Sequence, residues 1–293
     1  MQLEHGLISL LFAIAVVHSV SLQDSKCGYI SEDQFLIMNA FAIPTEHQWL
    51  AGITYMNGQE MKLQNNGCVG VLISKRNVLA PAHCFLQYDG HVEVFSVLLG
   101  VWNKSSSLGD ASCDRNGFCV LPAQDIPVKE IAIYPEYDPL TLKHDLAVLT
   151  LQRDAQLTPN VMPICMPPPS KVNETLVGQL FVVAGLPIKD ELKHKAYVHI
   201  HSRSYCQKEH SSLLSSSNTV CGYQDKSMMY HLGAPLVGIH VKMDAPQSYY
   251  LVGLLLDEKE NVDGEDSVAA SFLDVRPYLK FINRNADFLI ISD

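Results

Sequence analysis

The sequence predicts an all-β fold, either a barrel or a sandwich, in two halves of similar size. Short runs rich in aliphatic, aromatic and β-branched residues recur between Gly, Pro and Asn, without amphipathic helices between them. The clearest runs are residues 69–73, 92–99, 146–151, 179–184 and 249–256. A chain of 293 residues, 47% of them hydrophobic, is long enough to bury a core in each half.

A proline-rich run at residues 163–169 separates the two halves. It ends in three prolines, which lack the amide hydrogen that a sheet ladder needs, so we expect a crossover there. Near the C-terminus, apolar side chains at 275, 278, 279 and 282 share one helical face. Asp274 suits the cap of this helix and Pro277 its first turn. We therefore expect a helix over residues 275–285, docked on the second half.

The N-terminal apolar run at residues 7–17 is too short to cross a bilayer and is typical of a secretory signal peptide, assigned here to residues 1–20. A buried N-terminal helix is the alternative. The chain has eight cysteines, an even number that fits disulfides in an oxidising compartment. Sequons at Asn103 and Asn173 would then carry glycans. The expected location is secreted and extracellular.

The charge of the chain restricts its partners. A formal net charge of -10 disfavours nucleic acid and anionic membranes, because a polyanion would be repelled. We therefore expect protein partners, and the sequence indicates no cofactor.

Two motifs carry a resemblance to a known family. The sequence GCVGVLI at residues 67–73, followed by VLAPAHC at 78–84, is similar to the histidine segment of the chymotrypsin-like and trypsin-like serine proteases (peptidase S1). HDLAVL at residues 144–149 resembles the aspartate segment of that family. PICMP at 163–167 and LVGLL at 251–255 resemble its inter-barrel connector and a strand that lines its substrate cleft. His83 and Asp145 would be the two matching catalytic positions.

The resemblance implies two six-stranded antiparallel β-barrels of the trypsin-like type with a C-terminal α-helix. The protease-like domain would span residues 36–293, and residues 21–35 would form a short segment tethered by Cys27. The family pattern also implies a set of disulfides. These are Cys27 with Cys165, Cys68 with Cys84, Cys206 with Cys221, and the remaining pair Cys113 with Cys119.

The nucleophile is absent from the matching segment. The family places it in GDSGGPL, and residues 230–236 read YHLGAPL, so Leu232 stands at the serine position. A leucine cannot attack a carbonyl. Tyr230 replaces the glycine whose amide contributes to the oxyanion hole, and His231 replaces the aspartate that pairs with the new amino terminus after zymogen cleavage. We therefore expect a pseudo-protease with no functional catalytic residue.

The residues at the activation site and at the substrate-specificity position also differ from the family pattern. The new terminus would be Leu36, and no Lys or Arg immediately precedes it. Lys226 falls near the position where trypsin-like members place a specificity aspartate. The acidic run at residues 257–266 at the cleft mouth is predicted to be a solvated loop, with a docking role as the alternative.

Other residues have a functional and an ordinary interpretation. We expect His83 and Asp145 to support the barrel interface rather than to perform acid–base chemistry, because a base without a nucleophile has nothing to activate. Ser227 is the nearest hydroxyl upstream of Leu232, but it lies too far along the chain to replace it.

Four histidines are candidates for a metal site. His199 and His201 alternate along a predicted strand, and with His194 or His210 they could bind a metal. We expect ordinary surface histidines instead, and no metal.

The sequence thus favours a non-catalytic serine protease homologue that regulates, or acts as a cofactor in, an extracellular proteolytic cascade by protein binding. The Cys27 tether and the Cys113 loop look similar to arthropod clip-domain-type homologues of immune and melanisation cascades, although we expect no cysteine-rich clip module from the residues ahead of Cys27. One alternative is a weak or atypical serine-type endopeptidase that uses another nucleophile. Another is a binding protein for carbohydrate, lipid or metal.

Overall fold

The computed structural model describes residues 27–32, 34, 40–57, 60–62, 67–85, 92–114, 117–209, 218–225, 228–260, 268–288 and 290. The expected signal peptide, Leu36, Lys226, Ser227 and His210 lie outside the described residues. Within the described part of the chain, no helix is both long and apolar enough to cross a membrane.

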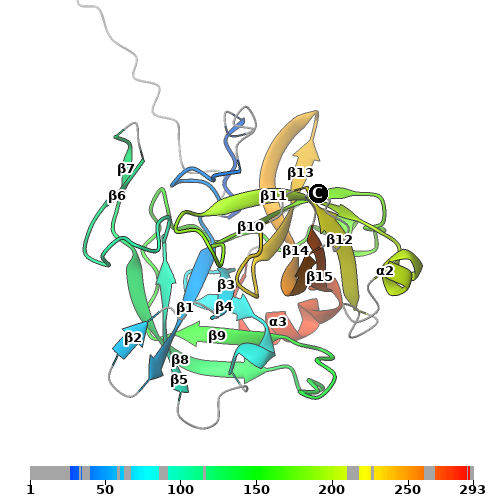
Figure 1. Cartoon of the computed structure of the whole chain (residues 1–293), viewed down its shortest axis with the longest axis horizontal. Helices are drawn as coiled ribbons and strands as arrows, with labels where there is room; N and C mark the ends of the chain where they lie inside the picture. Colours follow the sequence, from blue (N-terminus) through cyan, green and yellow to red (C-terminus); the bar gives the residue numbers. More distant parts are fainter. Residues whose placement is uncertain are drawn as a thin grey trace, which may run out of the picture.

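Six antiparallel strands close into a first barrel (Figure 1). In ring order they are β1 (Leu50–Asn57), β3 (Val69–Leu72), β4 (Asn77–Ala80), β9 (Ala147–Leu151), β8 (Gln124–Ile133) and β5 (Val92–Leu99), with β5 pairing back to β1. The short strand β2 (Glu60–Lys62) pairs with the end of β1 as an addition to the ring. A hairpin of β6 (Ser112–Cys113) and β7 (Cys119–Val120) extends from this half.

The second barrel is also closed and antiparallel. Its ring order is β10 (Leu180–Gly185), β11 (His194–Ile200), β12 (Thr219–Gln224), β15 (Val268–Asp274), β14 (Ala245–Glu260) and β13 (Pro235–Lys242). Helix α1 (Pro169–Val172) lies in the crossover that leads from β9 to β10, and α2 (Arg203–Glu209) lies between β11 and β12. The expectation of two six-stranded barrels is confirmed, and of the barrel and the sandwich that the strand pattern allowed, the barrel is present.

The C-terminal helix is shorter than predicted and contacts both barrels. A 3₁₀ turn over Arg276–Tyr278 leads into α3 (Leu279–Asn285), and the Arg276 amide donates to the Asp274 carboxylate at 3.0 Å. The Tyr134 ring, which follows β8, makes edge contacts with the rings of Tyr278 and Phe281. The segment was expected on the second barrel, where the Val275 amide donates to the Val252 carbonyl, and these aromatic contacts bind it to the first barrel as well.

The eight cysteines form four disulfides. They join Cys27 to Cys165, Cys68 to Cys84, Cys113 to Cys119 and Cys206 to Cys221, which are the pairs that the family resemblance implied. The first of them connects the N-terminal segment to the crossover between the barrels, across 138 residues.

Candidate active site

The predicted histidine and aspartate meet between the two barrels. His83 lies in a 3₁₀ turn, Ala82–Phe85, directly after β4, and Asp145 lies just before β9. The His83 ring donates from Nδ1 to Asp145 Oδ2 at 2.6 Å, and the His83 backbone amide donates to Asp145 Oδ1 at 2.8 Å. His83 is 3% exposed and Asp145 is fully buried. The carboxylate thus fixes both the ring and the backbone of the histidine.

The other ring nitrogen of His83 faces a disulfide. Nε2 lies 3.9 Å from Cys68 Sγ and 3.8 Å from Cys84 Sγ. Neither sulfur of a disulfide carries a proton or a negative charge. This group has the spacing of metal ligands, but it offers no thiolate to a metal because the two sulfurs are bonded to each other.

Leu232 is held next to this disulfide. Its backbone forms a parallel β-bridge with Cys68, and the Val69 amide donates to the Leu232 carbonyl at 2.8 Å. The half-buried Leu232 side chain packs against the cores of both barrels. The next residue, Gly233, has φ +88°, and a Cβ there would lie 1.9 Å from the Val69 carbonyl oxygen. A glycine is therefore required for the backbone to pass so close to β3.

The Tyr230 amide is hydrogen-bonded to a buried carboxyl group. Tyr230 N donates to Glu258 Oε2 at 2.7 Å, and Gln224 Nε2 donates to Glu258 Oε1. Burial, with Glu258 and Asp225 nearby, raises the pKa of the Tyr230 phenol. The phenol oxygen is buried, and among the described residues it has no hydrogen-bond partner. The side chain packs against Gly185, where a Cβ would lie 2.9 Å from Tyr230 Cδ1.

His231 is fixed by backbone groups. Its Nδ1 donates to the Gly67 carbonyl at 2.9 Å, and its own amide donates to the Leu186 carbonyl at 3.1 Å. Burial lowers the pKa of the ring, as does nearby Lys104, while the Gly67 bond acts in the opposite sense. A neutral ring at this position fits the buried surroundings.

The trypsin family model matches residues 39–229, well over half of the chain. The chain belongs to the trypsin family. It is 26% identical over 225 residues to CLIP domain-containing serine protease B9 of Anopheles gambiae, covering 72% of this chain and 53% of that one. The chain is 28% identical to Serine protease 7 of Drosophila melanogaster, and the alignment covers 78% of this chain and 60% of that one. The chain thus spans about half the length of the curated relatives that it matches.

A solved trypsin-family structure and an inactive relative also match. The Drosophila Grass clip serine protease of the Toll pathway aligns with a TM-score of 0.71 at 19% identity, covering 92% of this chain and 78% of that one, which shows the shared fold. Inactive serine protease PAMR1 of Bos taurus is 23% identical, covering 74% of this chain and 32% of that one.

The candidate metal histidines do not gather in the described part of the chain. His194 is buried beside Asp190, with 3.2 Å from Nε2 to Oδ2, whereas His199 is exposed on the opposite face of β11. His201 follows the end of the strand and stacks on Tyr205. Alternation along the strand separates His194 from His199, because their positions differ by an odd number.

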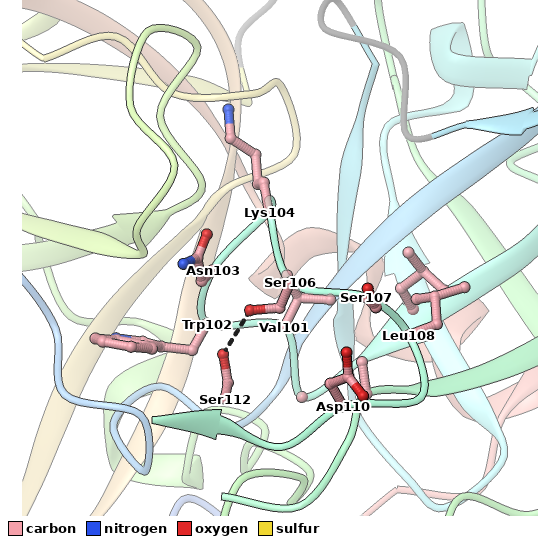
Figure 2. Close-up of a pocket in the computed structure, with 12 residues that line it drawn as sticks. Val101, Trp102, Asn103, Lys104, Ser106, Ser107, Leu108, Asp110 and Ser112 are labelled. Atoms are coloured by element: carbon pink, nitrogen blue, oxygen red, sulfur yellow. Dashed lines mark hydrogen bonds between the residues drawn. The ribbon is translucent and has the colours of Figure 1, made fainter. Parts of the chain in front are cut away.

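The two sequons differ in exposure. Asn173 is exposed at the C-terminal end of α1. Asn103 is half-buried, and its Oδ1 accepts the Ser105 amide at 2.9 Å. Asn103 lines a small pocket of about 50 Å³. Figure 2 shows it with two other lining residues, Ser106 and Ser112, whose hydroxyl oxygens are 3.0 Å apart. Both remain predicted glycosylation sites, and Asn173 is the more accessible of the two.

Sequence reasoning missed two features. The acidic run was expected to be a solvated loop, but residues 257–260 belong to β14 and Glu258 is buried. The second feature is the contact of buried Glu46 with buried Lys193 and half-buried Lys195. No local pattern indicates either one, because the partners lie up to 149 residues apart.

Proposed function

We propose that this protein is a secreted, non-catalytic trypsin-family homologue that regulates an extracellular proteolytic cascade, or serves as its cofactor, by binding proteins. The observation that carries the proposal is the aliphatic side chain of Leu232, in the segment that matches the family's nucleophile segment and packed where the two barrels meet. The remnant triad positions His83, Asp145 and Leu232 would then stabilise the interface between the barrels.

Loss of the nucleophile has a large energetic cost. Removing the nucleophilic serine alone from such an enzyme costs about a millionfold in turnover, close to 8 kcal/mol of transition-state stabilisation. The His83–Asp145 pair cannot replace that loss, because a general base needs a hydroxyl to deprotonate. The bond from Tyr230 N to Glu258 also engages the amide that would be an oxyanion donor in the family. Two separate requirements of acyl transfer are thus unmet.

The names of the relatives support a cascade setting. They include Melanization protease 1 of Drosophila melanogaster and Phenoloxidase-activating factor 1 of Holotrichia diomphalia, which are 33% and 29% identical over about half of this chain. A secreted location agrees with the four disulfides. We therefore propose that the binding partners are proteases, their zymogens or their substrates in an innate immune or melanisation cascade.

The first test is chemical. The secreted protein is treated with a fluorophosphonate probe, with an active trypsin-like enzyme as the positive control, and no labelling is expected. Leu232→Ser is also expected to stay unlabelled, because the Tyr230 amide remains bonded to Glu258. Labelling of the wild-type protein that disappears in Ser227→Ala would contradict the proposal and favour an atypical peptidase.

The second test is functional. A purified clip-domain zymogen is incubated with its activating protease, and the rate of cleavage is measured with increasing amounts of this protein. We expect a saturable change in rate, together with recovery of the zymogen or protease on the immobilised protein. An unchanged rate, with retention of carbohydrate or lipid only, would favour the simple binding protein instead.

A further inference from the structure

One of the four disulfides lies on the surface. Cys113 and Cys119 are both exposed, whereas the six cysteines of the other three disulfides are at most 6% exposed. A thiolate opens a disulfide by attacking one of its sulfurs, so the rate depends on access to that sulfur. Of the four bridges in the folded protein, the bridge between Cys113 and Cys119 is therefore the one that an outside thiol reaches most easily.

The bridge lies beyond the buried base of a surface hairpin. Cys113 pairs directly with Cys119 across β6 and β7, and Figure 1 shows this hairpin extending away from the first barrel. Ser112 and Val120 form the neighbouring pair at the base, and both are buried. The two cysteines thus stand outside the packed part of the hairpin, so a reagent approaches them without disturbing the core.

The turn of this hairpin is closed by hydrogen bonds that do not involve sulfur. The Asp114 amide donates to the Phe118 carbonyl at 2.8 Å, and the Phe118 amide donates to Asp114 Oδ1 at 2.8 Å. The Gly117 amide donates to the Asp114 carbonyl at 3.1 Å. These bonds keep the two cysteines close together after the bridge opens. The two thiols then have a high effective concentration, and the bridge can close again.

The fold depends least on this bridge. Its sequence separation is 6, against 15, 16 and 138 for the other three disulfides. In the chain-entropy model, the bridge that closes the shortest loop contributes the least to stability. The three buried bridges stay closed when it opens, including the bridge that fixes the N-terminal segment to the crossover between the barrels. Opening of the surface bridge is therefore a local event.

Exposed apolar side chains flank the bridge. Phe118, next to Cys119, is 50% exposed, and Leu121, just after β7, is 56% exposed. A protein that reaches the two sulfurs would bury these side chains, and burial of apolar surface favours association. The surroundings of the bridge therefore suit a protein thiol as well as a small one.

We infer that the Cys113–Cys119 bridge is a thiol–disulfide exchange site that accepts two electrons from a dithiol. One thiolate of the dithiol attacks a bridge sulfur, forms a mixed disulfide and releases the other cysteine as a thiolate. The second thiol of the dithiol then attacks the mixed disulfide, so the dithiol leaves as a disulfide and its two protons end on the two cysteines.

A monothiol is a poorer reductant at this site. After its attack, the released cysteine lies beside the mixed disulfide and closes the bridge again before a second monothiol arrives. The second thiol of a dithiol is already attached and competes with this closure. The inference does not rest on the proposed function, because exchange at the bridge does not involve the former catalytic site.

The first test is selective reduction of the folded wild-type protein. The protein is incubated with dithiothreitol at pH 8, samples are alkylated with iodoacetamide, and the labelled cysteines are located by peptide mass spectrometry. We expect Cys113 and Cys119 to be labelled at least about tenfold faster than the other six cysteines, because buried bridges react only after local unfolding. 2-Mercaptoethanol at the same thiol concentration is expected to give less doubly labelled product. Reduction of Cys68–Cys84 at the same rate as Cys113–Cys119 would overturn the inference.

Two controls distinguish exchange from general unfolding. The double variant Cys113→Ser/Cys119→Ser is expected to lack the rapid labelling phase and to keep the slow one. Near-UV circular dichroism of the wild-type protein, followed during reduction, is expected to stay native while Cys113 and Cys119 become labelled. Loss of the near-UV signal together with this labelling would contradict a local opening and overturn the inference.

A trapping experiment distinguishes a protein dithiol from a small one. A thioredoxin whose second active-site cysteine is replaced by serine cannot resolve the mixed disulfide that it forms. We expect it to form a covalent complex with the wild-type protein through Cys113 or Cys119, and no complex with the double serine variant. Selective reduction by dithiothreitol without a complex would assign the site to small dithiols. A complex through any other cysteine would overturn the inference.

Discussion

Glu258 has a raised pKa of about 8, chiefly because burial disfavours its charge, with the bonds from Tyr230 and Gln224 acting in the opposite sense and Asp257 adding to the rise. Between pH 4.5 and 8 the folded protein keeps this proton while the unfolded protein releases it, so raising the pH favours unfolding. The stability that protonated Glu258 contributes to the fold is fully present below pH 4.5 and is lost as the pH rises to about 8. We predict that the stability of Glu258→Gln rises relative to that of the wild type by roughly 4 kcal/mol from pH 4.5 to pH 8.

Urea unfolding at pH 5, 6, 7 and 8 measures the difference between E258Q and wild type. Asp257→Asn is the control, because its side chain is exposed one position away. Parallel stability curves for E258Q and the wild type would contradict the prediction.

Sequence motifs predicted some residues of the candidate site, but they did not predict the contacts of Glu258. His83 and Asp145 could be placed from motifs, because each motif is local and its family spacing is specific. Three of the cysteine pairs came from the family resemblance, and Cys113 with Cys119 was the pair that remained. Glu258 could not be placed in this way, because DEKE reads as a solvated stretch until a bulge turns one side chain inward. Its donors come from residues 224 and 230, which no local pattern connects to residue 258.

At the scale of elements, the segment before β1 is bound to the second barrel by a buried lysine. Lys193 Nζ donates to the Pro44 carbonyl at 3.4 Å and to the Glu46 carbonyl. Lys195 Nζ pairs with the Glu46 carboxylate, and the Ala42 amide donates to the Lys193 carbonyl. Lys193 therefore joins the N-terminal segment to the start of β11.

We predict that Lys193→Met destabilises the fold and changes its pH dependence. Burial lowers the pKa of Lys193 to about 7, although Glu46 raises it. Between pH 7 and 10 the unfolded protein binds a proton that the folded protein does not, so wild-type stability rises with pH. The gap between wild type and K193M should widen by up to about 1.4 kcal/mol per pH unit. Urea unfolding of both proteins at pH 7, 8 and 9 measures this gap in stability.

Lys129→Met is a suitable control because Lys129 is exposed on β8. A gap between wild type and K193M that stays constant from pH 7 to 9 would show that Lys193 is charged in the folded protein.

The sequence predicted that residues 249–256 form a strand, but it did not predict how long that strand is. Residues 249–256 were expected to form one strand, whereas β14 spans Ala245–Glu260. The extension depends on long-range pairing with β13 and β15, including register shifts at residues 240–241 and 255–257. Hydrophobic pattern alone marks the buried centre of such a strand, because its ends are polar and gain their structure from neighbours.

For the whole molecule, the disulfide from Cys27 to Cys165 is expected to contribute most among the four. It closes the longest loop, with a sequence separation of 138 against 6 for Cys113 and Cys119. The chain-entropy model gives about 5 kcal/mol for the long loop and about 2 kcal/mol for the short one. The long bridge also fixes the N-terminal segment, because the Gly28 amide donates to the Pro163 carbonyl and the Gly28 carbonyl accepts the Tyr249 amide.

We therefore predict that replacing both Cys27 and Cys165 with serine lowers the free energy of unfolding by about 3 kcal/mol more than replacing both Cys113 and Cys119. Urea unfolding of the two double variants under non-reducing conditions measures this difference. The comparison is matched, since each variant loses one bridge and gains two hydroxyls. Equal losses would mean that the N-terminal segment is held by its backbone bonds and by Lys193 rather than by the disulfide, so that the tether adds nothing to the coupling between the two barrels.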